Sequence, residues 1–184
     1  MKEQKSDKEL VEEFLKGDEY SFNLIVNRYR EKIYWHARRM TGDHFDADDI
    51  VQEVLIVLYK KLKDFRFDSA LYTWIFRITA TRSINLIKRK NMRRFLPIGQ
   101  DIKRISDSGT DIVRDIENKE RLKKLDTVLQ KLPVKQREVF ILRNFDELSY
   151  EEIAEITGKS TGGLKANYFH AVKKINEMME DKDE

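Results

Sequence analysis

The scarcity of proline and glycine is the feature that most constrains the fold of this chain. The 184 residues include two prolines and seven glycines, so few positions force a helix to stop or favour a tight turn. Such a chain favours long helices over strands joined by turns. We therefore predict an all-α protein. A hydrophobic fraction of 40% is sufficient for a buried core, although 38% of the residues are charged.

Apolar residues recur at helical spacing in two blocks. The first block spans residues 7–95 and the second spans residues 118–180. The segment between them, residues 96–117, has no such periodicity and contains one proline, two glycines and two serines, a composition typical of a flexible linker. The sequence thus predicts two small helical domains joined by a flexible linker.

Capping residues mark several expected helix ends. Asp7 is expected to cap the first helix. The second helix is expected to begin near Asp18 and to be closed by a turn at residues 41–43, Thr-Gly-Asp. In the second block, Pro133 stops one helix and Gly158 ends another.

Charge and cysteine content exclude several classes of protein. The net charge is only +3, so binding to nucleic acid would have to come from local clustering of basic residues. The absence of cysteine excludes disulfides and thiolate metal sites and fits a reducing compartment. The sequence has no apolar run of the roughly 18 residues that a membrane span needs, and its N-terminus lacks the apolar core of a signal peptide. We expect a cytoplasmic protein with no direct membrane insertion.

Basic residues are concentrated between Ser69 and Gln100, a stretch that contains no Asp or Glu. Cations attract phosphates, and aromatic rings can stack on unpaired bases. We expect this stretch to be helical. Its expected buried set is Leu71, Trp74, Ile75, Ile78, Ile84 and Ile87, and its expected opposite arc is Arg77, Thr81, Arg82, Asn85, Lys88 and Arg89. The preceding loop, residues 65–69, offers two aromatic rings and polar groups, as a pocket for a flipped base requires. The alternative is an ordinary basic face in solvent, with Trp74 in the core.

Residues 149–176 have the spacing of a helix-turn-helix. Ser149 and Glu152 stand at capping-box spacing, Ala154 is a small residue in mid-helix, and Gly158 ends that helix. The expected second helix, capped by Ser160, carries lysines and no acid as far as Asn176. Such a helix can lie in the major groove of DNA. An ordinary helical hairpin with a basic solvated face remains the alternative.

No constellation of residues indicates catalysis. Asp46, Asp48 and Asp49 resemble a magnesium site, because Mg²⁺ prefers oxygen ligands, but no general base, glycine-rich phosphate loop or nucleophile accompanies them. The favourable interaction of acids with a helix N-terminus explains this cluster more simply. The three histidines, His36, His44 and His170, are each expected at the surface or partly buried. We predict no enzymatic activity, no metal and no cofactor.

With both blocks considered, the sequence resembles a bacterial RNA polymerase sigma factor of the extracytoplasmic-function (ECF) type. Residues 48–54 (DDIVQEV) resemble the motif with which this family contacts core polymerase. Residues 73–78 and 81–85 resemble the segment that melts and holds the minus-ten promoter element. Residues 132–140 and 150–154 resemble the domain that reads the minus-thirty-five element.

The resemblance implies partners and a role for each surface. It implies a transcription-initiation factor that binds promoter DNA, both double-stranded and melted, and core polymerase through the clamp helices of its largest subunit and the flap of its second-largest subunit. Members are commonly controlled by an anti-sigma factor. The implied polymerase contacts are Asp48, Asp49, Gln52 and Glu53. The implied minus-ten contacts are Arg66, Phe67, Tyr72, Trp74, Arg77, Thr81, Arg82, Asn85, Lys88 and Arg89.

The resemblance is weakest in the expected recognition helix. The family often has arginines where this chain has Asn167, His170 and Val172. Reading of DNA there would depend on backbone amides, Lys165 and DNA shape instead of arginine–guanine pairs. The implied minus-thirty-five contacts are Ser160, Thr161, Gly162, Lys165, Asn167, Tyr168, His170 and Lys173.

Two other functional classes compete with a sigma factor. A self-sufficient helix-turn-helix regulator would use residues 7–95 as a sensor or dimerisation domain, but the sequence shows neither a ligand-pocket signature nor a dimer interface. A magnesium-dependent nucleic-acid enzyme would need the catalytic groups that are missing here. Binding to core polymerase separates the first class from the other two.

Overall fold

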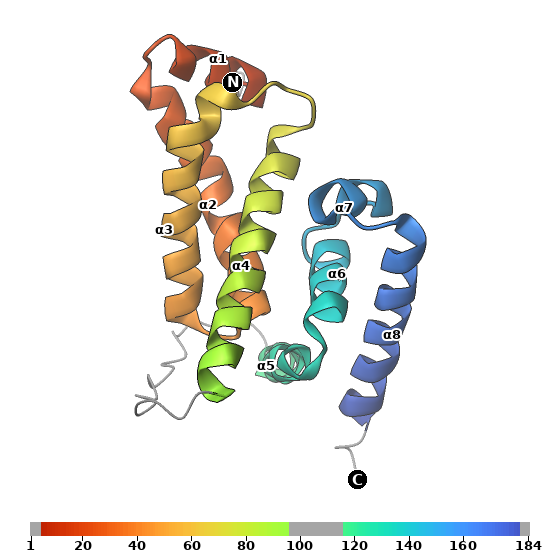
Figure 1. Cartoon of the computed structure of the whole chain (residues 1–184). Helices are drawn as coiled ribbons and strands as arrows, with labels where there is room; N and C mark the ends of the chain where they lie inside the picture. Colours follow the sequence, from red (N-terminus) through yellow and green to blue (C-terminus); the bar gives the residue numbers. More distant parts are fainter. Residues whose placement is uncertain (1–4, 96–115, 181–184) are drawn as a thin grey trace.

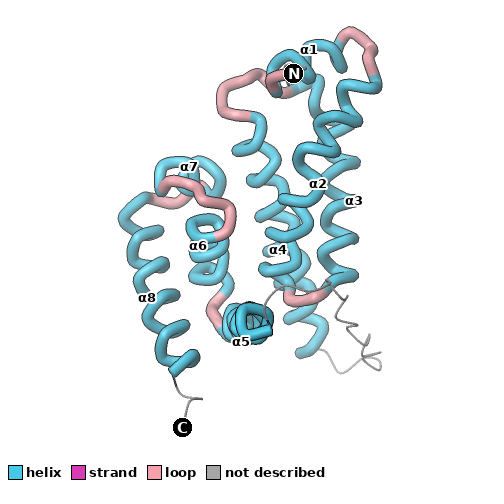
Figure 2. Tube along the Cα trace, turned by 180° about the vertical axis from the view of Figure 1, so that it is seen from behind, coloured by secondary structure: helices cyan, strands magenta, loops and turns pink. Residues whose placement is uncertain are grey.

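The computed structural model describes residues 5–95 and 116–180, and within them the side chains of 5–93 and 124–180. All regular elements in these ranges are helical, in agreement with the predicted all-α fold (Figures 1 and 2). The first group is α1 (Asp7–Leu15), α2 (Glu19–Thr41), α3 (His44–Lys61), a 3₁₀ turn (Leu62–Asp64) and α4 (Leu71–Phe95). The second is α5 (Ile116–Lys131), α6 (Val134–Asn144), α7 (Tyr150–Thr157) and α8 (Thr161–Glu180). The expected linker lies mostly outside the described residues.

The N-cap of α1 is Ser6, so the predicted cap at Asp7 is wrong. The Ser6 hydroxyl accepts a hydrogen bond from the Glu9 amide at 3.3 Å, and the Glu9 carboxylate accepts one from the Ser6 amide at 2.7 Å. The Asp7 carboxylate instead binds α2, where it pairs with Arg28 and accepts from the Tyr29 hydroxyl. Asp7 therefore fixes α1 on α2.

The ends of α2 agree with the sequence. Asp18 accepts a hydrogen bond from the Tyr20 amide at 3.1 Å and caps the helix N-terminus. Gly42 follows the last turn with a left-handed backbone, φ +76°, a conformation that glycine adopts without steric penalty. Asp43 then caps α3 by accepting from the Asp46 amide at 2.9 Å.

Helices α2, α3 and α4 run side by side, and α1 lies across one end of them (Figure 1). We call this group the N-terminal bundle. Its core is built from apolar residues at helical spacing, and its wholly buried members include Leu10, Val11, Ile25, Ile33, Ala37, Val54, Leu62 and Ile75.

Helices α5–α8, the C-terminal unit, pack directly against this bundle (Figure 2). Met40 of α2 is buried among residues of α5, α6 and α8, and Phe76 and Ala80 of α4 are buried among residues of α6, α7 and α8. Helix α4 is therefore covered on two faces. Phe76 was not among the residues expected to be buried. Of those that were, Leu71 and Ile75 are buried, whereas Trp74, Ile78, Ile84 and Ile87 are only half-buried.

Candidate nucleic-acid interface

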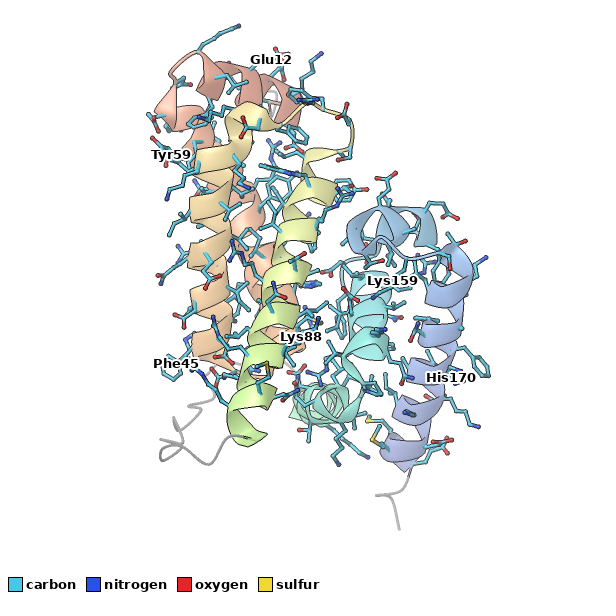
Figure 3. All side chains as sticks on the ribbon, viewed as in Figure 1. Glu12, Phe45, Tyr59, Lys88, Lys159 and His170 are labelled. Carbon is cyan, nitrogen blue, oxygen red and sulfur yellow. The ribbon has the colours of Figure 1, made fainter. Side chains whose placement is uncertain are left out.

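The outer arc of α4 is a continuous polar and basic surface. All six residues predicted for it are exposed, in order along the helix Arg77, Thr81, Arg82, Asn85, Lys88 and Arg89. Lys88 is labelled on this helix in Figure 3. Since the stretch contains no Asp or Glu, nothing within the helix itself neutralises these cations. The arc is suited to binding phosphates.

A groove between α3 and α4 brings the predicted polymerase contacts beside the predicted DNA contacts. Its walls include Asp49, Gln52 and Glu53 from α3 and Arg82 from α4. Arg82 and Glu53 form an ion pair across it, with Nη1 and Oε2 3.3 Å apart. Asp48, the fourth predicted polymerase contact, lies one turn from His44 on α3 and pairs with it at 3.3 Å. The sequence placed both sets on separate helices and did not indicate that they meet.

The loop before α4 holds a cluster of aromatic rings. Phe65 lies between Phe67 and Trp74, with ring centroids 4.8 and 5.2 Å away. Phe67 is 40% exposed and has a left-handed backbone, φ +60°, which for a non-glycine residue stores strain of about 1–2 kcal/mol. Strain of this kind concentrates at binding sites. Arg66 is exposed between the two phenylalanines.

Two of the predicted minus-ten residues contact the C-terminal unit instead of solvent alone. Arg77 donates from Nε and Nη2 to the carbonyl of Glu155, at 3.1 and 2.5 Å. The Tyr72 hydroxyl donates to the carboxylate of Glu152. Both acceptors belong to α7.

The predicted helix-turn-helix is present as α7, a short turn and α8. Ser149 and Glu152 form the expected capping box at the start of α7, and Gly158 ends it with a left-handed backbone, φ +67°. Ser160 caps α8 by accepting from the Gly163 amide at 3.3 Å. Lys159, at the turn (Figure 3), pairs with the buried carboxylate of Glu138 on α6 at 2.5 Å. The turn is thus tied to the helix behind it.

The exposed face of α8 differs in part from the one expected. The exposed residues include Gly162, Lys165, Phe169, His170 and Lys173, which follow one another at helical spacing. His170 lies on the side of α8 that faces away from α6 (Figure 3). Phe169, absent from the expected contacts, is 65% exposed. The spacing of Leu164, Ala171 and Ile175, which form the buried face of α8, could have indicated that Phe169 is exposed.

Two predicted contacts on α8 already have partners, Tyr168 on α6 and Asn167 within α8. The ring of Tyr168 stacks on Phe140 of α6, with centroids 6.2 Å apart and planes 17° apart, and its hydroxyl donates to Asn144 at 3.2 Å. Asn167 is half-buried and donates to the carbonyl of Gly163 at 2.7 Å. Thr161, the first residue of α8, is also half-buried.

The acidic cluster at the start of α3 does not converge on one point. The buried carboxylate of Asp46 pairs with Lys90 of α4, while Asp48 pairs with His44. Across the described residues, no group of three or more His, Asp or Glu side chains is arranged to hold a metal ion.

His36 is wholly buried, so its expected position at or near the surface is wrong. Its Nδ1 lies 2.7 Å from a carboxylate oxygen of Asp146, in the connection between α6 and α7. The ring also meets the edge of Phe76 on α4, with centroids 5.6 Å apart. The sequence did not indicate this burial, because the partner of His36 is 110 residues away along the chain.

No helix in the described part of the chain combines the length and apolar character needed to cross a membrane.

Comparison with known proteins finds matches to both halves of the chain. Residues 25–93 match the family described as Sigma-70 region 2, and residues 122–175 match the family described as Sigma-70, region 4. The ECF RNA polymerase sigma-E factor of Escherichia coli K12 is 34% identical over 96% of this chain and 95% of its own length. The RNA polymerase sigma-H factor of Pseudomonas aeruginosa is 32% identical over the same shares.

Two solved structures share the fold. CnrH in complex with the cytosolic domain of CnrY matches with a TM-score of 0.73 at 21% identity, over 97% of this chain and 99% of that one. The sigma factor RpoE in complex with the anti-sigma factor NepR, from Bartonella quintana, matches with a TM-score of 0.69 at 22% identity, over 88% and 98%. The likeness covers both groups of helices.

Proposed function

The chain belongs to the ECF family of RNA polymerase sigma factors, and from that premise we propose how its surfaces divide the work of initiation. A sigma factor directs core polymerase to specific promoters and promotes the melting of DNA. RNA synthesis is the chemistry of the polymerase, so we assign no catalytic residue to this chain. We propose that it acts in the cytoplasm, with domains at residues 7–95 and 118–180 and a linker at 96–117.

The observation that carries this proposal is the acid-free arc of α4 beside the aromatic loop. Phosphates of the promoter would bind Arg82, Lys88 and Arg89, whose exposed cations have no acid neighbours on their own helix. A base of the melted strand would enter the loop against Phe67, because an exposed ring offers a stacking surface. This division assigns affinity to the arc and sequence preference to the loop.

We assign binding of core polymerase to the exposed face of α3. Asp49, Gln52 and Glu53 are exposed there and line the groove that α3 shares with α4, while Asp48 pairs with His44 on the same helix. An acidic face is complementary to a basic partner surface, for which we propose the clamp helices of the largest polymerase subunit. The flap of the second-largest subunit is the proposed partner of the C-terminal unit.

We assign reading of the minus-thirty-five element to the exposed face of α8. Lys165 and Lys173 can bind phosphates, and His170 and Phe169 face outward between them. A phenylalanine in the major groove makes apolar contact with thymine methyl groups. Tyr168, by contrast, packs against α6, and the Asn167 amide bonds within α8 itself.

We also propose that an anti-sigma factor controls this protein. The support is that two proteins with the same fold were solved as complexes, CnrH with the cytosolic domain of CnrY and RpoE with the anti-sigma factor NepR.

Run-off transcription with core polymerase over a promoter library tests the proposed function. The expected result is core-dependent initiation from a subset of promoters that share minus-ten and minus-thirty-five sequences. A parallel pull-down should recover core polymerase, and a Gln52→Ala/Glu53→Ala variant should recover less while keeping its helical content. Failure of the wild-type protein either to bind core enzyme or to initiate from any promoter would overturn the assignment.

A further inference from the structure

The helix-turn-helix is attached to α6 by a buried ion pair. Glu138 of α6 is only 2% exposed, and its carboxylate lies 2.5 Å from the Lys159 ammonium. Lys159 is the single residue between Gly158, which ends α7, and Ser160, which caps α8. Within the part of the chain that the structure describes, Lys159 is the one cation at ion-pair distance from Glu138. The buried carboxylate therefore depends on the turn for its charge partner.

The cation that precedes Glu138 in the sequence has other partners. Arg137 is also buried, with an exposed fraction of 6%, and its guanidinium donates to the carbonyls of Gln130 and Leu132 at 2.8 and 3.2 Å. Both acceptors lie where α5 ends. Helix α6 thus carries two consecutive buried charges, of which the first fixes it to the end of α5 and the second fixes it to the turn before α8.

Stability alone is a poor explanation for a carboxylate at this position. Two charges lose their hydration when they are buried, and replacement of such a pair by apolar residues of similar volume is often neutral or stabilising. Val139 and Leu142, the neighbours of Glu138 on α6, are wholly buried in an apolar cluster that includes Leu164 of α8. An apolar side chain at position 138 would continue this cluster. What the ion pair adds is a fixed geometry, because apolar packing is not directional.

The N-terminal turn of α8 has few other side chains to hold it on α6. Gly162 and Gly163 have no side chains, and the first wholly buried side chain of the helix is that of Leu164. The stacking of Tyr168 on α6 lies about one turn further along. Lys159, immediately before the helix, therefore provides the charged anchor nearest to this end.

The proposed minus-thirty-five contacts are concentrated at the same end of α8. Ser160, Thr161, Gly162 and Lys165 all lie within or beside its first two turns. In a helix-turn-helix, the N-terminal residues of the second helix contact base edges in the major groove. Hydrogen bonds weaken steeply outside a narrow range of distance and angle. A small displacement of this end of α8 would therefore misplace several contacts together.

We propose that the ion pair of Glu138 and Lys159 sets the position of α8 for reading the minus-thirty-five element. The inference rests on the proposed function, which assigns that reading to α8. It adds a role for two residues that are absent from the expected DNA contacts. Glu138 is a positioning residue that acts through Lys159, and Lys159 binds α6 instead of a phosphate.

The main test replaces both charges by apolar side chains of similar volume, in a Glu138→Met/Lys159→Met variant of the full chain. Its free energy of unfolding in urea should equal or exceed that of wild type, because no charge remains buried. Core-dependent transcription from a promoter with both elements should fall about tenfold, a usual size for coupling between contacting residues. Transcription from a template that has a melted minus-ten region and no minus-thirty-five element should match that of wild type.

Single variants separate a positioning role from direct contact with DNA. Glu138→Gln releases Lys159, so transcription that depends on the minus-thirty-five element should fall if Lys159 positions the turn, and rise if Lys159 binds a phosphate. Lys159→Arg keeps a cation that can reach the carboxylate and should retain most of this transcription. Glu12→Gln is the matched control, because it removes only an exposed pair with Lys8 on α1, with Nζ and Oε1 3.9 Å apart, and it should have no effect.

Four outcomes would overturn the inference, and they point to different causes. If the double variant is stable and uses the minus-thirty-five element as wild type does, the pair does not position α8. If the double variant is less stable than wild type, the pair serves stability instead. If Glu138→Gln raises transcription, Lys159 binds DNA directly. If wild-type transcription needs neither core polymerase nor a minus-thirty-five element, the proposed function fails, and the inference fails with it.

Discussion

Arg82 of α4 and Glu53 of α3 form an ion pair across the groove between the two helices, with Nη1 and Oε2 3.3 Å apart. Both side chains are nearly half-exposed, and exposed pairs of this kind contribute only about 0–1 kcal/mol. The arginine can therefore exchange a carboxylate for a phosphate at little cost. One residue proposed to bind polymerase is thus the neighbour of one proposed to bind DNA.

Replacement of Arg82 by alanine should weaken open-complex formation at all promoters alike. Loss of one phosphate contact lowers the slope of log affinity against log salt by roughly one. The measurement is promoter binding by the holoenzyme over a range of salt concentrations. Glu53→Gln is the matched control, since it removes the ion pair but keeps the arginine: at saturating core enzyme its slope should equal that of wild type. A slope unchanged in Arg82→Ala would exclude the phosphate contact.

Replacement of Phe67 by glycine should change promoter choice without unfolding the protein. The substitution relieves the strain of a left-handed backbone, about 1–2 kcal/mol. It also adds chain entropy to the unfolded state, which costs about 0.5–1 kcal/mol, and removes the ring contact with Phe65, worth about 0.5–1.5 kcal/mol. These effects oppose one another, so the free energy of unfolding should change by less than about 1.5 kcal/mol. Transcription over a library of minus-ten sequences should show altered preference. Tyr20→Ala, at an exposed ring on α2, should leave that preference as in wild type.

Replacement of Gly158 by alanine should destabilise the C-terminal unit by about 1–2 kcal/mol through backbone strain. A Cβ at this position meets no atom within 4 Å, so steric clash does not contribute. Gly162→Ala is the control: it also has open space, but its φ is not positive, and alanine is favoured over glycine in a helix by up to about 1 kcal/mol. Urea unfolding should show a lower free energy of unfolding than wild type for Gly158→Ala and a higher one for Gly162→Ala. Changes of the same sign in the two variants would contradict the strain argument.

Tyr168 and Phe169 should behave differently despite being adjacent. Tyr168→Ala removes a ring stacked on Phe140 and a hydrogen bond to Asn144, so it should reduce stability by about 1–3 kcal/mol. Phe169→Ala should change stability by less than about 0.5 kcal/mol and reduce transcription that depends on the minus-thirty-five element. If Phe169→Ala left all promoters unaffected, the outward face of α8 would lose its proposed role at this position.

Asp126 of α5 should make stability depend on pH. Burial, the larger influence, raises the pKa of its carboxyl, whereas Arg38 and Arg39 lower it. A carboxyl whose pKa is raised on folding favours the native state when protonated, and this contribution is lost as pH rises through the folded pKa. At pH 7, Asp126→Asn should therefore be more stable than wild type. This difference in stability should disappear below about pH 4, the pKa of the carboxyl in the unfolded chain. A difference in stability that grows on acidification would contradict a raised pKa for Asp126.

The sequence predicts those parts of the fold that depend on local chemistry. The capping box of Ser149 and Glu152, the left-handed Gly158 and the outer arc of α4 follow from spacing and side-chain type, and each is found where expected. The cap at Ser6 was missed because Asp7 is also a good cap. Asp7 contacts Arg28 and Tyr29 on α2 instead.

The contacts between the two groups of helices could not be predicted in this way. Burial of His36 depends on Asp146, and burial of Phe76 depends on α7, and neither partner is near in sequence. Periodicity assigns one buried face to a helix, so it cannot identify a second buried face on α4. For the same reason, periodicity could not predict that Arg77 of the candidate site donates to the Glu155 carbonyl.

The position of Met40 has a consequence for protein engineering. This residue lies in the last turn of α2, a helix of the N-terminal bundle, yet its side chain is buried with Leu129, Ile141 and Ala171. A hybrid that joins the first four helices of this chain to the last four of another sigma factor would place Met40 and Phe76 against unmatched side chains. Promoter specificities are thus not freely exchangeable between paralogues by cutting at the linker, unless Met40 and Phe76 are redesigned with the graft.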